Sequence, residues 1–381
     1  MKLYYWCPFF SNIATEKAVI NSIVALNKFS KKKINPYLLD VIGEWDNQKF
    51  NLLDKKIEKH DLLNFKLIKY LPKFGFLKSR FSYIIVFFFS IFRLHKFLKN
   101  QKPDYLIVHL MTFIPLTLLL FFNYKKKIIL RISGYPKLNF LRKFFWKIVS
   151  KKLYKIFTPT EITKKMLIKN GVFREDQIFL LRDPIISIKN LNTLKTKKID
   201  DNFEFENYIL SIGRLTKQKN FQFLIKAYAF VKQEITNLPK LLIIGEGEER
   251  NYLTKKIREN KLEKDVFLLG YKNNIFQYLN KSLFFILSSD WEDPGFVLVE
   301  AAASNKLILS SDVLSGPKEF LRNKSSGFLF EKENFKDFKN KIQHILNDTN
   351  SKEIYFKRIN AKKNSRSYTI FHHYKELSKL L

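Results

Sequence analysis

Two glutamates, Glu292 and Glu300, flank a junction between a strand and a helix in the last third of the chain. The apolar run 283–287 predicts a buried parallel strand, a Pro-Gly pair then breaks it, and a helical apolar pattern begins at Phe296. The N–H groups of residues 295–297 would lie in the first helical turn, where they lack intrahelical partners and the helix dipole favours an anion. Carboxylates accept hydrogen bonds from hydroxyl groups, so the pattern predicts a ligand with phosphate and hydroxyl groups, such as a sugar nucleotide. The plainer alternative is an N-cap acid and a solvated helical acid.

A second group of charged residues follows residues 208–212, which predict another strand. Gly213 would let the chain turn tightly, and Arg214 and Lys219 would project two cations from one loop. Such cations could hold a diphosphate and stabilise the charge that grows on it as a glycosidic bond breaks. Both could equally be surface cations, an alternative that is weaker for Arg214 because arginine is scarce in this chain.

These motifs together resemble one enzyme family. The Glu-x7-Glu spacing gains specificity from Gly-Phe-Val-Leu at 295–298, from Gly-Arg-Leu at 213–215 and from Lys-Asn at 219–220. A closing Gly-Phe-Leu-Phe strand at 327–330 extends the likeness. The chain therefore resembles the retaining glycosyltransferases of family 4, also called group 1, most closely over residues 208–330.

The resemblance implies an α/β protein of the GT-B class, with two doubly wound, Rossmann-like domains that face a cleft. It implies that Glu292 contacts hydroxyl groups of the donor sugar and that Glu300 contacts those of the ribose. The catalytic residues expected are Glu292, Arg214 and Lys219, and the donor-binding residues are Gly213, Tyr271, Gly295, Phe296, Val297 and Glu300. The reaction is expected to need no metal. No cofactor is expected either, because the UDP- or GDP-linked sugar is itself a substrate.

Three residues are candidates for the acceptor side. His109 ends the predicted strand 103–109 at the carboxyl edge where ligands collect in open α/β sheets, although a lone histidine there is more often structural. Ser133 stands where many members of the family have a histidine before a glycine. Asn12 lies in the first loop, where family members often carry a Gly-Gly pair. The serine argues against a histidine-assisted mechanism, and the missing Gly-Gly pair argues against a direct carry-over of the first loop's role.

The composition limits the class of protein. The 381 residues predict two domains, and the single cysteine, Cys7, excludes an intrachain disulfide and fits a reducing compartment. The start of the chain has no long apolar core, so no signal peptide is predicted. The net charge of +34 could reflect the codon usage of an AT-rich genome, or it could favour anionic partners. Nucleic acid is disfavoured because the sequence has no RNA-binding signature and no zinc-ligand cluster.

The alternation of strands and helices divides the chain into parts. We expect an acceptor-binding Rossmann-like domain over 1–189, a polar linker over 190–206 and a nucleotide-sugar-binding Rossmann-like domain over 207–364. The tail, 365–381, is expected to form a helix that crosses back to the first domain, as the resemblance implies.

Three apolar segments of the first domain are rich in lysine and arginine. Residues 81–92 are almost all apolar but too short to span a bilayer, which needs roughly 20 apolar residues. Residues 62–78 mix apolar side chains with lysines, as an interfacial segment does, although a core face with a lysine-rich outside is at least as good an interpretation. For the amphipathic helix predicted over 140–152, packing on the sheet is preferred to membrane contact.

The function expected is retaining transfer of a hexose-like sugar from a nucleotide-diphosphate donor to a glycan or lipid-linked acceptor. The expected setting is lipopolysaccharide or other cell-surface polysaccharide synthesis in the cytoplasm, with peripheral contact to the anionic inner face of the plasma membrane. Two alternatives remain: a nucleotide-sugar epimerase or phosphorylase-like enzyme on the same fold, and a basic RNA- or membrane-binding module that is no enzyme.

Overall fold

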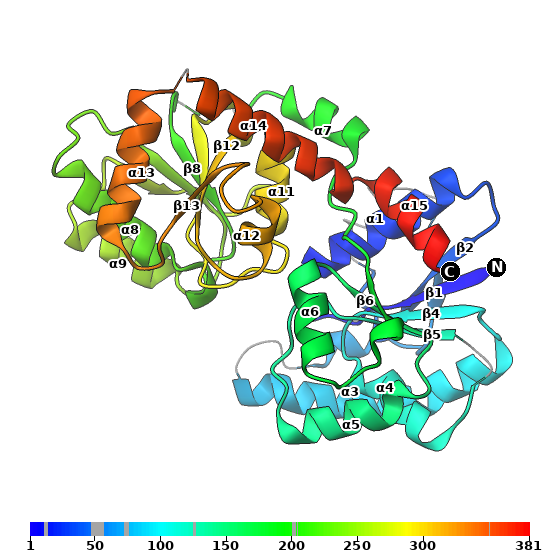
Figure 1. Ribbon diagram of the computed structural model, residues 1–381. Helices are drawn as coiled ribbons and strands as arrows, with labels where there is room; N and C mark the ends of the chain where they lie inside the picture. The colour runs from blue at the N-terminus through cyan, green and yellow to red at the C-terminus, as the bar shows by residue number, and fades with distance from the viewer. Residues whose placement is uncertain are drawn as a thin grey trace. The chain divides into compact units, whose positions relative to one another are not determined.

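The structure is a computed structural model that describes residues 1–10, 14–46, 57–71, 76–124, 127–199, 203, 205–349 and 351–381. The chain divides into two compact units. Unit 1 comprises Met1–Pro184 and Ile370–Leu381, and unit 2 comprises Ile185–Thr369. Each unit is an open sheet of parallel strands with helices on both faces (Figure 1).

Unit 1 contains, among the described residues, a seven-stranded sheet in the order β3-β2-β1-β4-β5-β6-β7, and all the pairs are parallel. Strands buried on both faces read as continuous apolar runs, which is why β4 is Tyr-Leu-Ile-Val. The strands are β1 Lys2–Trp6, β2 Asn35–Asp40, β3 Glu58–Asp61, β4 Tyr105–Val108, β5 Lys127–Arg131, β6 Lys155–Thr158 and β7 Ile178–Leu180.

Helices cover the two faces of this sheet. The α-helices of unit 1 are α1 Ala14–Phe29, α3 Phe76–Asn100, α4 Phe113–Phe121, α5 Phe140–Ser150, α6 Glu161–Lys169 and α15 Ile370–Leu380, with 3-10 turns at Leu67–Lys69 and Glu175–Gln177. Alternate strand residues, such as Tyr4 and Tyr5, enter different cores. One core lies under α3, α4 and α5, and the other lies under α1 and α15, which pack against each other (Figure 1).

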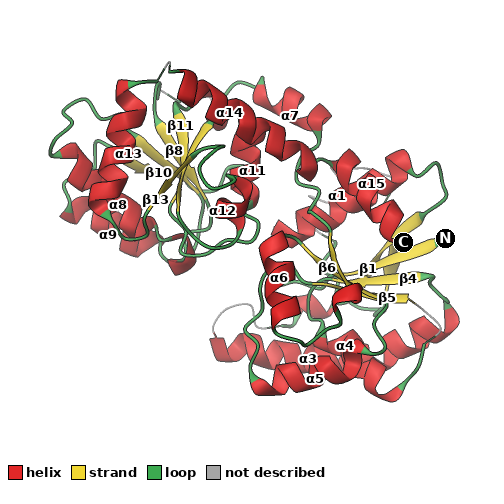
Figure 2. Cartoon of the chain, viewed as in Figure 1, coloured by secondary structure: helices red, strands yellow, loops and turns green. Residues whose placement is uncertain are grey.

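Unit 2 repeats the arrangement with a six-stranded parallel sheet in the order β10-β9-β8-β11-β12-β13 (Figure 2). Its strands are β8 Ile209–Ile212, β9 Leu241–Ile244, β10 Val266–Leu268, β11 Phe284–Leu287, β12 Leu307–Ser311 and β13 Phe328–Phe330. Its helices are α7 Ile188–Lys195, α8 Phe221–Lys232, α9 Arg250–Glu259, α10 Phe276–Lys281, α11 Phe296–Ala303, α12 Gly316–Phe320, α13 Phe335–Asn347 and α14 Lys352–Ser365, with 3-10 turns at Lys217–Lys219 and Arg366–Tyr368. Helices α8, α9 and α13 cover one core, and α7, α10, α11 and α14 cover the other.

The division between the units differs from the sequence expectation. It falls after Pro184 rather than after residue 189. The expected linker, 190–206, lies in unit 2 and begins with most of α7, whose Leu191 is buried in the core beside α10. One buried leucine is enough to hold a short polar helix, and such a helix has too little periodicity to be recognised in the sequence. The tail returns to unit 1 from Ile370 as α15.

Helix α3 is longer than the apolar run within it. The run 81–92 lies inside a helix of 25 residues, of which Arg80–Asn100 is long and apolar enough to cross a membrane by length and composition alone. This corrects the expectation that the segment is too short. Of the apolar window, 39% is buried within the fold, and core helices pass the same test, so the finding is weak evidence for a span.

Helix α5 packs on the sheet, as preferred, but with only part of its apolar surface. Trp146 and Val149 are buried in the core of unit 1, and Phe145 packs against that core. Phe140, Phe144 and Ile148 are exposed, so the rest of the stripe recognised in the sequence points to solvent. Helical periodicity identifies a stripe without showing which side of the helix meets the core.

We predict that truncating a side chain lowers the stability of the protein on the buried side of α3 and hardly changes it on the exposed side. Leu94→Ala should lower the free energy of unfolding by about 2–5 kcal/mol, because Leu94 is fully buried and its loss leaves a cavity. Phe92→Ala removes a larger side chain that is 78% exposed, and the change should stay within about 0.5 kcal/mol. Denaturant unfolding of both variants measures the difference. Equal losses of unfolding free energy would contradict the assignment of Leu94 to the buried side of α3 and of Phe92 to the exposed side.

Candidate functional site

The predicted donor residues meet where the order of strands in unit 2 reverses. From β8 the chain proceeds outward through β9 and β10, then returns to place β11 on the other side of β8. The carboxyl ends of β8 and β11 therefore lie side by side, and their loops diverge. In open α/β sheets this switch point is where ligands bind. Gly213 and Arg214 follow β8, and Glu292 belongs to the loop after β11.

An ion pair joins the two loops. The Nζ atom of Lys219 donates to Oε1 of Glu292, and the two side chains are only 12% and 7% exposed. The hydroxyl of Ser289 donates to the same oxygen at 2.8 Å. The other oxygen, Oε2, has no hydrogen-bond partner within the part of the chain that the structure describes. The carboxylate is therefore fixed in orientation with one oxygen left for a ligand hydroxyl.

Further hydrogen bonds hold the same two loops together. The hydroxyl of Ser288 donates to the carbonyl of Lys219 at 2.8 Å, and Nδ2 of Asn220 donates to Oδ1 of Asp290 at 3.0 Å. The backbone N–H of Asp290 donates to the carbonyl of Gln218 at 2.9 Å. Ser288 and Ser289 were not predicted as site residues from the sequence. The one pattern that could have indicated them is a pair of hydroxyl residues at the end of a buried strand.

The two predicted cations differ in environment. Lys219 is nearly buried and paired, whereas Arg214 is exposed. Within the described ranges the guanidinium of Arg214 has no hydrogen-bond or ion-pair partner. Arg214 is thus available for a diphosphate, while Lys219 has to serve Glu292 at the same time. Its ammonium group has three N–H donors and can do both.

Helix α11 begins as the sequence predicts. Gly295 is its N-cap residue with φ = +86°, and its carbonyl accepts from the N–H of Leu298 at 3.1 Å. An L-residue rarely adopts this left-handed conformation, so the glycine lets the first turn, with Phe296 and Val297, start directly beside Glu292. Glu300 is buried in the second turn.

A chain of close backbone contacts links three loops at this edge. The N–H of Gly245 donates to the carbonyl of Gly270 at 3.0 Å, and Gly270 precedes the exposed Tyr271. The N–H of Gly213 donates to the carbonyl of Ile244 at 3.0 Å. A Cβ at Gly245 would lie 1.8 Å from the carbonyl oxygen of Gly213, so only glycine fits there.

Gly213 is required for a different reason from the one expected. Its backbone is not in the left-handed region, so a tight turn is not what selects glycine. A Cβ at this position would approach the side chain of Lys219 to 3.2 Å. The missing side chain leaves room for the lysine on its way to Glu292.

The acceptor-side candidates meet in unit 1. His109 and Ser133 both line a pocket of about 730 Å³ at the carboxyl ends of β4 and β5. His109 is 8% exposed, and within the described part of the chain both its ring nitrogens and the hydroxyl of Ser133 lack hydrogen-bond partners. Buried polar groups are nearly always paired, so a ligand is the expected partner. Asn12, the third candidate, lies outside the described residues.

His109 is held neutral. Burial, and after it the charge of Arg131, keep the pKa of His109 well below its ordinary value. A neutral imidazole offers one N–H donor and one acceptor nitrogen, which suits a sugar hydroxyl. Nothing in the sequence indicated Arg131, whose partner Asp183 is 52 residues away.

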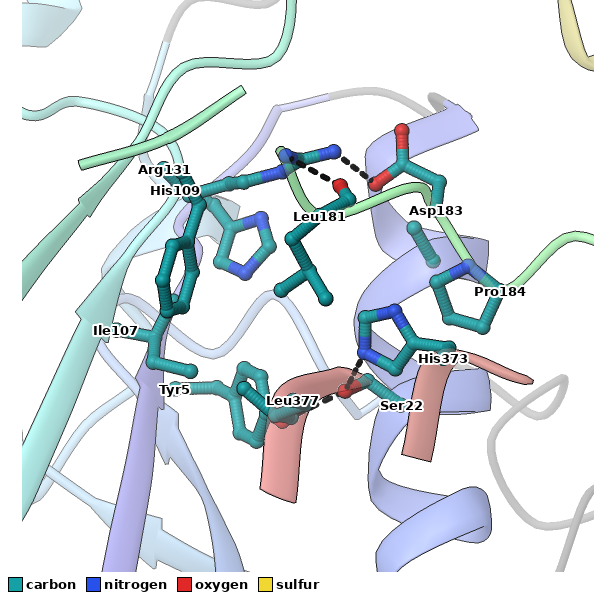
Figure 3. A pocket seen from close by; sticks show the side chains of 12 residues that line it. Tyr5, Ser22, Ile107, His109, Arg131, Leu181, Asp183, Pro184, His373 and Leu377 are labelled. Carbon is teal, nitrogen blue, oxygen red and sulfur yellow. Dashed lines mark hydrogen bonds and ion pairs between the residues drawn. The ribbon is translucent and has the colours of Figure 1, made fainter. Parts of the chain in front are cut away.

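A buried polar network lies behind His109 (Figure 3). The guanidinium of Arg131 donates to the carboxylate of Asp183 at 2.5 Å and to the carbonyl of Leu181 at 2.8 Å. The cavity that these groups line has a volume of only about 10 Å³, too small for anything larger than a water molecule. It is therefore a structural support for His109 rather than a second binding site.

Helix α15 supplies the other half of this network (Figure 3). Burial lowers the pKa of His373 to about 4, so the ring is neutral near pH 7. Its Nδ1 lies 2.8 Å from the carbonyl of Arg182, which can only accept, so Nδ1 carries the proton. Nε2 then accepts from the hydroxyl of Ser22 at 2.8 Å, and Ser22 accepts from the hydroxyl of Tyr5 at 2.7 Å.

Comparison with known families identifies the class. Residues 193–364 match the family described as glycosyl transferases group 1. An uncharacterized glycosyltransferase of Methanocaldococcus jannaschii is 29% identical over 319 residues, which cover 77% of this chain and 71% of that protein. Residues 193–364 thus resemble the group 1 glycosyltransferases, and the chain, with its two doubly wound parallel sheets, has the GT-B fold.

Two further proteins show how far the similarity extends. The N-acetylgalactosamine-N,N'-diacetylbacillosaminyl-diphospho-undecaprenol 4-alpha-N-acetylgalactosaminyltransferase of Campylobacter jejuni is 28% identical over 242 residues, 61% of this chain and 64% of that protein. The crystal structure of Anabaena Alr3699/HepE in complex with UDP matches 100% of this chain and 99% of its own, with a TM-score of 0.70 and 15% identity. At that identity the match shows the fold alone.

We predict that Gly245→Ala will disrupt the donor side of unit 2. The new Cβ would collide with the Gly213 carbonyl, forcing the loop after β8 to move and costing about 1–3 kcal/mol of stability. Affinity for UDP or GDP, measured calorimetrically, should fall at least roughly tenfold, since the shifted loop carries both cations. Gly171→Ala is the matched control, because Gly171 also has a positive φ (+61°) but has open space around it. It should leave nucleotide binding unchanged, and unchanged binding in Gly245→Ala would count against the loop assignment.

Proposed function

We propose that the chain is a retaining, metal-independent glycosyltransferase. It would move a hexose-like sugar from a UDP- or GDP-linked donor to a glycan or lipid-linked acceptor. The observation that carries this proposal is the buried pair of Lys219 and Glu292, which stands at the switch point of unit 2 between Arg214 and the first turn of α11.

Charge stabilisation is the main task on the donor side. When the bond between the sugar C1 and the diphosphate oxygen breaks, negative charge grows on the departing diphosphate. Arg214, Lys219 and the N–H groups of Phe296 and Val297 would stabilise that charge. Oε2 of Glu292 would accept from a hydroxyl of the donor sugar, Glu300 from the ribose hydroxyls, and Tyr271 would lie by the base.

The proposed mechanism gives the role of a metal ion to two side chains. The cations of Arg214 and Lys219 would neutralise the charge of the diphosphate. We propose that no metal and no cofactor are needed beside them, since the nucleotide-sugar is itself a substrate.

The acceptor would occupy the pocket of unit 1. Neutral His109 and the hydroxyl of Ser133 would orient the acceptor hydroxyl by hydrogen bonds. The hydroxyl oxygen forms the new bond to C1 on the side from which the diphosphate leaves, and its proton passes to the departing diphosphate. This course leaves the anomeric configuration unchanged.

We place this activity in the assembly of lipopolysaccharide or another cell-surface polysaccharide, at the cytoplasmic face of the membrane. The name of the Campylobacter relative describes an acceptor carried on diphospho-undecaprenol, and the Anabaena protein was crystallised with UDP. The first supports a lipid-linked acceptor and the second supports a nucleotide-sugar donor, and these are the substrates to try first.

The experiment that tests the function supplies a panel of UDP- and GDP-sugars with short lipid-linked acceptors. Product formation followed by NMR should show an unchanged anomeric configuration, and EDTA should leave the rate unaffected. Inversion, or loss of activity with EDTA that a divalent metal restores, would overturn the corresponding part of the proposal. Conversion of the donor with no acceptor present would indicate an epimerase instead.

We predict that the two cations can be separated by their effects. Arg214→Ala should lower kcat by about 10²-fold or more, because a preorganised electrostatic partner is lost, and should leave the melting temperature unchanged. Lys219→Ala should lower both, since it leaves the buried Glu292 without its cation, at a cost of about 3–5 kcal/mol. Full activity in Arg214→Ala would remove the leaving-group assignment.

A further inference from the structure

Helix α3 presents most of the aromatic side chains of its first four described turns to solvent and its serines to the core. Ser82 and Ser90 are fully buried, and the hydroxyl of Ser90 donates to the carbonyl of Val86. Phe88 and Phe92, by contrast, are 66% and 78% exposed. A helix that is apolar on all sides normally lies inside a protein or in contact with a membrane. The exposed side of α3 therefore requires a partner.

The neighbouring helices α4 and α5 also expose aromatic side chains to solvent. Phe121 at the end of α4, and Phe140 and Phe144 of α5, are each at least 60% exposed. Helix α4 packs against both α3 and α5, and the three helices lie side by side on one face of the sheet (Figure 1). We call their exposed side the aromatic surface, defined by Phe81, Phe88, Phe92, Phe121, Phe140 and Phe144.

The positive charge of the chain is concentrated in this region. Residues 62–160 contain 20 lysines and arginines but only one acidic residue, Asp104, so they carry +19 of the total of +34. The lysines and arginines are only slightly denser here than elsewhere, as codon usage would give, but codon usage does not explain why acidic residues are almost absent from this stretch. Lys143, Lys147 and Lys151 are exposed along α5 beside Phe144, an arrangement typical of helices that lie in a membrane interface.

We infer that the aromatic surface docks on an anionic lipid bilayer, with its phenylalanines in the interface and the surrounding cations on the headgroups. A second copy of the chain is a poor occupant, since two surfaces of like charge would meet. A bilayer crossing is also disfavoured, because Leu94 and Val86 of α3 are buried in the core of unit 1 and would have to leave it.

The acceptor pocket adjoins the aromatic surface. Tyr83 of α3 and Leu141 of α5 line the pocket and are also exposed. A molecule anchored in the bilayer would thus have its polar end beside His109 and Ser133. This step rests on the proposed function, whereas docking does not, and the experiment below contains neither donor nor acceptor.

The experiment measures co-sedimentation of the full chain with vesicles of phosphatidylcholine, with and without 30% phosphatidylglycerol. The double variant Phe88→Ser and Phe92→Ser should lower the partition coefficient roughly tenfold or more, because two rings no longer enter the interface. The matched control changes Tyr355 and Phe356, an exposed aromatic pair on α14 of unit 2, to serine and should bind like the wild type. Circular dichroism verifies that each variant is folded.

A second pair of variants tests the charge without touching the rings. Lys143, Lys147 and Lys151→Gln should weaken binding to anionic vesicles by roughly fivefold per lysine at low salt. The control changes Lys255, Lys264 and Lys281 of unit 2, which are equally exposed, and should have little effect. Equal losses in both sets, or equal binding to neutral vesicles, would overturn the proposal. So would retention of the protein in the membrane after carbonate extraction, or a dimer in solution that Phe88→Ser and Phe92→Ser abolishes.

Discussion

The buried ion pair between Lys219 and Glu292 is the contact on which the donor side of the protein depends. Two charges withdrawn from water are stable only if they meet in good geometry and their remaining hydrogen-bonding capacity is used. Ser289 meets part of that need, and Gly213 leaves room for the lysine to reach its partner. The reversal of strand order brings the two loops together in the first place. Removing either partner of the pair would leave the other charge buried without compensation.

The two units use the same edge of the same kind of sheet for different chemistry. In unit 2 the loops after β8 and β11 carry the ion pair of Lys219 and Glu292, which fixes these two side chains before any ligand arrives. In unit 1 the ends of β4 and β5 carry His109 and Ser133, whose polar atoms are unsatisfied among the described residues. Fixed charges suit a diphosphate, whose geometry is constant. Neutral groups with unused hydrogen-bonding capacity suit a hydroxyl, whose position depends on the acceptor.

The sequence predicted the strands and the helix start of unit 2, because both are local. The runs 208–212 and 283–287 became β8 and β11, since parallel strands buried on both faces are mostly apolar, and the helix beginning at Phe296 followed from a glycine and a change of period. What it could not predict depends on distant residues. Ser22 and His373 are 351 positions apart, and their hydrogen bond becomes visible only when α1 and α15 pack together. The stripe on α5 was visible, but the side that it faces was not, since solvent exposure is decided by the neighbours of a helix.

Unit 1 is built from two stretches of chain that are separated by the whole of unit 2. During synthesis, therefore, all of unit 2 is translated before α15. Until then α1 lacks the helix that covers it, and the hydroxyl of Ser22 lacks the imidazole of His373. The support behind His109 is thus among the last parts of the molecule to form. Vectorial synthesis thus fixes the order in which the segments appear, and unit 1 cannot be completed until the whole of unit 2 has been translated.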